Sequence, residues 1–570
     1  MCGISGLAGR RWRREQLAAM VAAIAHRGPD GSGIYVDPEG RCGLGHNRLS
    51  IIDLSDAGTQ PMADASGTRW LSFNGEIYNF VELRAQFPDY PFHSGTDSEV
   101  ILAAYDKWGE ACVERFIGMF AFAIWDEATG ELFCARDRLG IKPFNYATID
   151  GAFAFASEIK ALIAAGLEPR PDWHTWGDYL RYGIYDHGER TFFAGVSALP
   201  PGHTLTWRDG AATVRRYWDV SAQPRLDLSD DEAADALDEL LRDAIRLRLR
   251  SDVPLGVNLS GGLDSTTLFA YVDASDEVGD ELNCFTAGFD DPQYDEAPFA
   301  AGVPRRKRWT QHVERLDPET AWRMIDPLMR HEEAPFGGIA TLAYFNLHRR
   351  IREENVTVVL EGQGVDEMFA GYAYYREPER AGAYQDGSSF LRPATLAPGL
   401  RDGPEPGPFP APFASALDNR LYRDIRHTKL PRVLRMNDRL SMAYGRELRP
   451  PFLDHRIVEF AFRLDENKKL RSDQGKFLFR HLLERKAPGG LAATPKRAVV
   501  TPQREWIRGP LREPIQDVIA SAAFREAGVF DQAEVQREFD AYCAGEGDNA
   551  FFIWQWLNFD SWRRAFGVSL

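Results

Sequence analysis

A cysteine stands at position two of the chain, in the opening run MCGISGLAG. A thiol this close to a terminus is open to oxidation, which makes a purely structural role unfavourable. If Met1 is removed, Cys2 carries its thiol and a free α-amine on one carbon. That amine titrates near neutrality, with a pKa of about 7.7–8.0. It can take the thiol proton itself or through water, so one residue would supply both nucleophile and base.

A second chemical signal lies in GVNLSGGLDST, at 256–266. An apolar strand is predicted over 255–259, and the run TTLFAYV that follows is typical of a helix. Two glycines let the backbone approach a phosphate closely, and amides at a helix N-terminus face such an anion. Because the loop has no lysine, it differs from the usual γ-phosphate loop, and Asp264 would place Mg²⁺ on the phosphates. The loop predicts ATP cleaved between its α- and β-phosphates; the alternative is an ordinary strand-to-helix turn.

Bulk properties restrict the function classes. A chain of 570 residues is long enough for two to four domains. Its formal charge of −17 argues against nucleic acid as a partner, because phosphate-backbone binding needs clustered Lys and Arg. That charge does not exclude ATP, which a few local dipoles and a metal ion can hold. Six cysteines without paired spacing indicate a reducing compartment rather than a disulfide framework.

The run RRWRREQLAAMVAAIAHRG near the start resembles a secretory leader in its charge and small residues. Its apolar residues, however, recur at helical spacing, at Leu17, Met20, Val21 and Ile24. We therefore expect an amphipathic helix in a cytoplasmic protein. No apolar run approaches the roughly 18 residues of a membrane span, so no membrane partner is expected.

The predicted secondary-structure pattern changes near residue 220. Up to about 210 it is mostly strand and hairpin patterns, which favour a layered α+β domain. Beyond 226 a capping box, Ser229 with Glu232, opens a helix, and short apolar strands then alternate with helical stretches. This alternation favours a parallel sheet with covering helices. We expect domains over 2–212 and 226–570, with the Pro- and Gly-rich segment 386–412 as a mobile surface insertion.

With these motifs in order, the chain resembles the glutamine-dependent asparagine synthetases over nearly its whole length. SGGLDS is similar to their pyrophosphate loop, and MCGI, HRGPDG, HNRLSIID, NGEIYN and SGTDSEV are similar to the signatures of a class II glutamine amidotransferase domain. The resemblance implies an α+β N-terminal-nucleophile (αββα) glutaminase domain. An α/β parallel-sheet ATP-pyrophosphatase domain with a helical C-terminal part would follow it.

For the glutaminase half, the resemblance implies that Cys2 attacks the side-chain amide of glutamine and releases ammonia. Asn74 and the Gly75 amide would form the oxyanion hole. Arg48 would bind the α-carboxylate as a two-pronged donor. Glutamine would thus be held by five residues: Arg48, Asn74, Gly75, Glu76 and Asp97.

For the second half, it implies that ATP and Mg²⁺ activate a carboxylate as an acyl-adenylate, which ammonia from a buried tunnel converts to an amide. Lys496 would steady charge on the α-phosphate, and Asp264 and Asp366 would share the metal. Glu447 and Arg449 would be acceptor-site candidates. The resemblance leaves a homodimer open. The implied ATP-binding residues are Leu259, Ser260, Gly261, Gly262, Leu263, Asp264, Ser265, Ala287, Glu361 and Gly362.

One loop departs from the family pattern. Asparagine synthetases commonly read Ser-Gly-Glu-Gly-Ser-Asp-Glu where this chain reads EGQGVDE, so the middle acid is Gln363. An amide neither accepts a proton from ammonia nor pairs with an ammonium as strongly as a carboxylate does. Gln363 is therefore a third acceptor-site candidate. The acceptor is either aspartate in a rearranged site or another carboxylate, such as a specialised metabolite or sugar acid.

Two rival functions are less favoured. A β-lactam-synthetase-like enzyme would close a ring with an internal amine and need no glutamine, so the presence of Cys2, Arg48, Asn74 and Asp97 argues against it. A non-catalytic sensor of glutamine or ATP would not need an intact loop over 260–265 with both candidate metal ligands.

Overall fold

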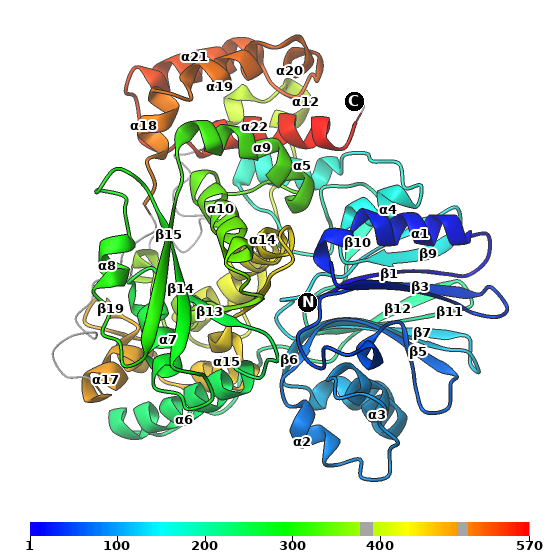
Figure 1. The fold of residues 1–570 in the computed structure, drawn as a ribbon. Coiled ribbons are helices and arrows are strands. Elements are labelled where there is room, and N and C mark those ends of the chain that lie inside the picture. The colour runs from blue at the N-terminus through cyan, green and yellow to red at the C-terminus, as the bar shows by residue number, and fades with distance from the viewer. Residues whose placement is uncertain (377–390, 487–499, 569–570) are drawn as a thin grey trace.

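The computed structural model describes residues 1–376, 391–486 and 500–568. Two halves lie side by side, with the N-terminal half on the right of Figure 1 and the parallel-sheet half on the left. The N-terminus lies between the two halves, and a group of C-terminal helices covers one end of the second half. No helix within the described ranges is long and apolar enough to cross a membrane.

The N-terminal half is built on two six-stranded antiparallel sheets that face each other. In order across the first sheet, the strands are β10 (Val196–Ala198), β8 (Asn145–Ile149), β9 (Ala152–Ala156), β1 (Gly3–Ala8), β3 (Cys42–Arg48) and β2 (Gly31–Val36). In the second they are β12 (Ala211–Arg216), β11 (His203–Arg208), β7 (Glu131–Arg136), β6 (Gly118–Asp126), β5 (Arg69–Ile77) and β4 (Met62–Ala63).

Each sheet is covered on its outer face by helices, which completes four layers. Helices α1 (Arg14–Ala23) and α4 (Ile159–Ala164) contact the first sheet, and α3 (Ser98–Trp108) contacts the second beside α2 (Phe80–Arg84). Strand β6 is apolar throughout because both of its faces are buried. Its side chains alternate, with Phe122 packing on the helix side and Trp125 packing between the sheets. The predicted αββα fold is confirmed, and Leu17, Met20, Val21 and Ile24 are buried as the helical spacing requires.

The second half contains a five-stranded parallel sheet in the order β15-β14-β13-β16-β17. Chain order runs outward from β13 to β15, and then β16 and β17 continue on the other side of β13. The switch point of the sheet is therefore between β13 and β16, where ligands bind in open α/β folds. The bounds are β13 (Leu255–Asn258), β14 (Glu281–Gly288), β15 (Arg308–Arg315), β16 (Val358–Leu360) and β17 (Glu447–Arg449).

Helices surround this sheet, and the first of them opens with the predicted capping box, in which Ser229 accepts from the Glu232 amide. A short hairpin of β18 (Leu470–Arg471) and β19 (Gln474–Gly475) precedes the last of them. The helices of this region are α6 (Asp230–Arg248), α7 (Leu263–Asp273), α8 (Ala297–Ala301), α9 (Pro318–Glu332), α10 (Ile339–Glu353), α11 (Val365–Met368), α13 (Ala416–Arg423), α14 (Leu430–Met442), α15 (His455–Arg463), α16 (Glu466–Lys469) and α17 (Phe477–Lys486).

A C-terminal helical group closes the molecule and ties the halves together. Its long helix packs on α5 (Trp173–Tyr182) of the N-terminal half, where Trp176 contacts Phe559 and Trp562 edge-on. The group consists of α18 (Gln503–Arg508), α19 (Arg512–Ala520), α20 (Ala522–Glu526), α21 (Gln532–Cys543) and α22 (Phe551–Ala565).

Two expectations about segments need correction. Strand β12 ends at Arg216, so the N-terminal domain continues past the expected boundary at 212. Part of the expected mobile insertion is anchored: Leu396 is buried and forms a bridge with Phe530, and the short helix α12 (Pro398–Arg401) follows. The anchoring results from backbone hydrogen bonds to the loop between α20 and α21. Residues 386–390 lie outside the described residues.

Candidate active sites

The thiol of Cys2 lines a small pocket of about 30 Å³ at the end of the two-sheet sandwich. Its Sγ lies 4.0 Å from the Leu49 carbonyl oxygen, and its backbone N–H donates to Asn74 Oδ1 at 3.0 Å. Burial raises the pKa of the Cys2 thiol, while the positive charge at the N-terminus lowers it. The thiol is therefore held as the neutral form until a base takes its proton.

Asn74 and Gly75 lie beside this thiol in the middle of β5. The Asn74 Nδ2 amide is buried without a hydrogen-bond partner, although its Oδ1 is engaged by Cys2. A buried donor without a partner, on a residue that is hydrogen-bonded to Cys2, is a group that could stabilise an oxyanion. Gly75 has a φ of +152°, and a Cβ there would lie 2.1 Å from the Met119 carbonyl oxygen. Only glycine fits this close pairing of β5 with β6.

The remaining predicted glutamine ligands line the same pocket: Arg48, Glu76 and Asp97. Arg48 donates to the carbonyl oxygens of Ser55 at 2.7 Å and Asp53 at 2.5 Å, which fixes its guanidinium at the pocket wall. Asp97 precedes α3 in the helix-capping position but accepts instead from the Ile77 amide at 2.7 Å.

The two acids of this pocket are buried close together. Burial raises the pKa of Asp97 to about 7, and burial together with the Asp97 charge raises that of Glu76. Two such carboxyl groups favour binding of a cation, because a positive group between them relieves both the repulsion and the desolvation.

Glu447 and Arg449 do not line the ATP-type pocket described below; they lie at the boundary between the halves. The Met1 ammonium binds Glu447 Oε2 at 3.0 Å, and Arg449 Nη2 lies 3.5 Å from Glu76 Oε1. The reason is topological, since β17 is an edge strand of the parallel sheet and its residues contact Met1 and Glu76 of the N-terminal half. Of the three acceptor-site candidates, Gln363 remains beside the second pocket.

The second pocket, of about 170 Å³, opens at the carboxyl ends of β13 and β16, which is the switch point of the sheet. The loop 260–265 forms one wall, and the Ser260 and Ser265 hydroxyl groups lie 2.9 Å apart. Gly261 has a φ of +75°, and a Cβ there would lie 2.7 Å from the Phe299 backbone. The turn therefore needs a glycine, and it directs the N-terminus of α7 into the pocket.

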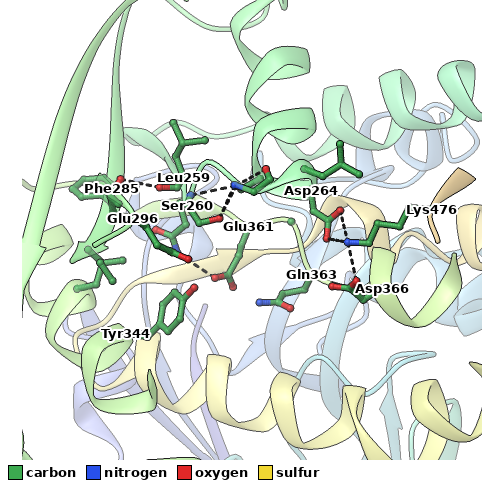
Figure 2. Close-up of a pocket in the computed structure, with 18 of the residues that line it drawn as sticks. Leu259, Ser260, Asp264, Phe285, Glu296, Tyr344, Glu361, Gln363, Asp366 and Lys476 are labelled. Atoms are coloured by element: carbon green, nitrogen blue, oxygen red, sulfur yellow. Dashed lines mark hydrogen bonds and ion pairs between the residues drawn. The ribbon is translucent and has the colours of Figure 1, made fainter. Parts of the chain in front are cut away.

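Lys476 is a functional candidate that sequence reasoning missed. Its Nζ lies 2.7 Å from Asp264 Oδ2 and 2.8 Å from Asp366 Oδ1, all at one end of the pocket in Figure 2. Burial alone would lower the pKa of Lys476, but the two carboxylates outweigh burial and raise it. The residue has a φ of +59°, and such strain concentrates at functional sites. The predicted Lys496 lies outside the described residues.

The donor set at this end fits a magnesium–phosphate complex. No group of three metal-ligating side chains exists among the residues the structure describes. Mg²⁺ bound with a nucleotide, however, uses only one or two carboxylates and takes its other ligands from phosphate and water. The Lys476 ammonium contacts both Asp264 and Asp366, so a single cation can reach both carboxylates. They could therefore serve as that pair.

The other predicted nucleotide residues also line this pocket. They are Leu259, Ala287, Glu361 and Gly362, and Tyr344 lies among them. Figure 2 shows Gln363 between Glu361 and Asp366. Except for Gly261, every predicted ATP-binding residue lines this one cavity.

Buried ion pairs connect the two pockets. Arg27 Nε donates to the Cys2 carbonyl oxygen at 3.0 Å, and its Nη1 donates to Glu158 at 2.7 Å and to Asp438 at 2.8 Å. Asp438 belongs to α14 of the second half, and the preceding residue, Asn437, donates to Glu361 Oε2 at 2.9 Å. A continuous chain of contacts thus leads from the thiol pocket to the phosphate-type pocket.

Comparison with protein families divides the chain in the same way. A family model described as a glutamine amidotransferase domain matches residues 1–218, and one described as asparagine synthase matches residues 236–564.

Individual relatives match the chain over most of its length. Asparagine synthetase [glutamine-hydrolyzing] 1 of Bacillus subtilis is 29% identical, over 99% of this chain and 96% of the relative. Amidase chry2 of Gibberella zeae is 28% identical, over 92% of this chain and 91% of the relative. Amidase chyE of Penicillium rubens is also 28% identical, over 95% of each.

The Arg27 contacts predict a large effect on stability. Arg27→Met leaves Asp438 buried without its main partner and removes one of the cations around the buried Glu158, and breaking a buried ion pair in this way costs about 3–5 kcal/mol. Urea denaturation followed by tryptophan fluorescence measures this loss. The control is Arg190→Met, whose exposed pair with Asp172 should contribute less than about 1 kcal/mol. Equal losses in the two variants would contradict the role assigned to Arg27.

Proposed function

The chain belongs to the asparagine synthase family and is an asparagine synthetase-like glutamine amidotransferase, and from that premise we propose a two-site reaction for it. Ammonia released from glutamine at Cys2 attacks an acyl-adenylate formed from ATP and a carboxylic acid in the second pocket. The products are an amide, AMP and pyrophosphate. The observation that carries the proposal is the buried Arg27, which contacts the carbonyl oxygen of Cys2 on one side and Asp438 of α14 in the second half on the other.

At the first site, Cys2 Sγ attacks the side-chain carbonyl carbon of glutamine, and a thioester forms as ammonia leaves. The unpaired Asn74 Nδ2 and the Gly75 amide stabilise the negative oxygen that develops. Arg48 binds the α-carboxylate of glutamine, and Glu76 with Asp97 binds its α-ammonium. Support comes from the convergence of Cys2, Arg48, Gly75, Glu76 and Asp97 on one small pocket, with Asn74 hydrogen-bonded to Cys2 beside it.

Removal of Met1 belongs to this proposal. In the full chain the Cys2 nitrogen is an amide that donates to Asn74 Oδ1. After removal of Met1, the same nitrogen is an α-amine beside its own thiol and acts as the base. Intact-mass measurement of the purified protein tests this step, because a retained Met1 would leave the thiol without that base.

At the second site, the loop 260–265 and the N-terminus of α7 hold the phosphates of ATP. Asp264 and Asp366 are the residues that would hold Mg²⁺, which neutralises charge on the departing pyrophosphate. An oxygen of the acceptor carboxylate attacks the α-phosphorus, and pyrophosphate leaves. Lys476 lies where its ammonium stabilises the charge on the reacting phosphates.

The acceptor is a carboxylic acid, with aspartate as the first candidate because it is the acceptor implied by the family resemblance. A second candidate is a different acid, such as a specialised metabolite or a sugar acid. Gln363 favours this second candidate, since it presents an uncharged amide in the pocket. The names of two relatives, which call them amidases rather than asparagine synthetases, are compatible with it.

Replacing the nucleophile separates the two sites. Cys2→Ala should abolish glutamine-dependent AMP formation, because no thioester can form. Added ammonium should restore it, because the second pocket is unchanged. Coupled AMP assays with each nitrogen source measure both. If ammonium fails to restore activity while the folded variant still binds ATP, the two-site scheme is wrong.

Lys476→Met should lower AMP formation by about 10²–10³-fold, the effect of removing one donor that stabilises transition-state charge. Glutamine hydrolysis at the first site should continue. The matched control is Lys486→Met on α17, because Lys486 binds Asp238 outside the pocket. Pyrophosphate release with ammonium measures the synthetase reaction, and equal rates in the two variants would exclude the role of Lys476.

A panel of carboxylic acids identifies the acceptor. With ammonium as the nitrogen source, pyrophosphate release is measured for aspartate, glutamate, sugar acids and aromatic acids. At least one acid should support AMP formation. Full-speed turnover with aspartate alone would eliminate the second candidate, and no turnover with any acid would count against the proposed reaction itself.

A further inference from the structure

Glu361 is a buried carboxylate in the wall of the second pocket. It follows β16 directly, and its side chain points into the cavity beside Tyr344 and Gln363 in Figure 2. Its Oε2 accepts from Asn437 Nδ2 at 2.9 Å, and its Oε1 lies 3.5 Å from Asn258 Nδ2. Among the residues that the structure describes, neutral amides thus hold the carboxylate in place and no cation pairs with it, which leaves its basicity available.

Helix α14 places this carboxylate on the side from which nitrogen would arrive. Asn437 contacts Glu361, and the next residue, Asp438, contacts Arg27, which binds the Cys2 carbonyl oxygen. The acids at the phosphate end are differently engaged, because Lys476 holds both Asp264 and Asp366. Glu361 is therefore the pocket carboxylate that contacts α14, and α14 also contacts Arg27 beside Cys2.

We propose that Glu361 is a catalytic residue that accepts the proton which ammonia must lose when it becomes an amide. The inference rests on the proposed function. The nitrogen lone pair forms the C–N bond at the acyl-adenylate carbonyl, the bond from that carbon to the phosphate oxygen breaks, and AMP leaves. One N–H proton moves to the Glu361 carboxylate, and the products are the amide, AMP and a protonated Glu361.

The surroundings of Glu361 suit a proton acceptor at neutral pH. Burial raises the pKa of Glu361 to about 7, although hydrogen bonds from Asn258 and Gln363 lower it. A base is most effective when its pKa is near the working pH. The other titratable groups that face it are Tyr344, whose pKa burial raises, and Glu296.

The contacts of Glu361 give a reason for an uncharged side chain at position 363. A second carboxylate beside Glu361 would raise the pKa of the pair by mutual repulsion. An amide at 363 instead donates to Glu361 and keeps it available as a single base. The negative charge of this loop therefore lies at 361 and not at 363.

The test compares steps of the reaction in Glu361→Gln, which keeps shape but removes basicity. With the best acid of the acceptor panel, ammonium-dependent amide formation should fall by about 10²–10⁴-fold, the usual contribution of a general base. ATP–pyrophosphate exchange, which reports adenylation alone, should be retained. With hydroxylamine, which is largely unprotonated at neutral pH, the loss in rate that Glu361→Gln causes should be at least about tenfold smaller than with ammonium. The matched control Glu459→Gln removes a half-buried carboxylate that accepts from Trp218 outside the pocket, and it should change neither rate.

A second variant guards against loss of folding. Asn437→Ala removes the hydrogen bond that orients Glu361 and should lower amide formation while pyrophosphate exchange continues. Loss of exchange in Glu361→Gln, with a raised KM for ATP, would assign the residue to nucleotide binding and overturn the proposal. Unchanged amide formation would overturn it too. Failure of the proposed function itself is distinct, because the unmodified protein would then show no exchange with any acid.

Discussion

The architecture depends on one buried guanidinium. Arg27 binds three groups: the carbonyl oxygen of Cys2, the carboxylate of Glu158 directly before α4, and the carboxylate of Asp438 in α14. A buried charge without partners costs several kcal/mol, so the arrangement in which all these contacts are made is strongly preferred. The position of the nucleophile is therefore set relative to the second half by ion pairs, and not by the connection between the halves. Helix packing of α5 on α22 adds apolar area to the same interface.

The second constraint is the topology of the parallel sheet. Because the strand order reverses beside β13, the loops after β13 and β16 separate to opposite faces and leave a crevice. The glycine-rich loop forms one wall of the crevice, and the loop with Glu361 and Gln363 forms the other. In the proposed reaction, phosphate binding and the chemistry of the acceptor would thus occur on adjoining loops, and a change in the second loop would alter the acceptor without disturbing the first.

The sequence was sufficient where the signal is local. The strand before Ser260, the capping box at Ser229 and the helix that carries Leu17 and Met20 each follow from neighbouring residues, and they appear in the structure as expected. Long-range contacts were not accessible in this way. Lys476 has no motif around it, and only the β18–β19 hairpin and its left-handed backbone bring it to Asp264. Glu447 and Arg449 were expected near the acceptor, but an edge strand turns them toward Met1 and Glu76. The roles of all these residues stay predictions.

The charges between the pockets also restrict which form of nitrogen can cross. Three buried cations, Arg27, Lys142 and Arg439, face three buried anions, Glu158, Glu333 and Asp438, and each of the six already has a partner. An ammonium ion entering this region would lose its hydration and would meet, among these described residues, only anions that already have a partner, which makes its transfer costly. Neutral ammonia needs only hydrogen bonds. In the proposed reaction, the charge balance of the interface would therefore select the nucleophilic form during transfer, and a proton acceptor would be required only where the new C–N bond forms.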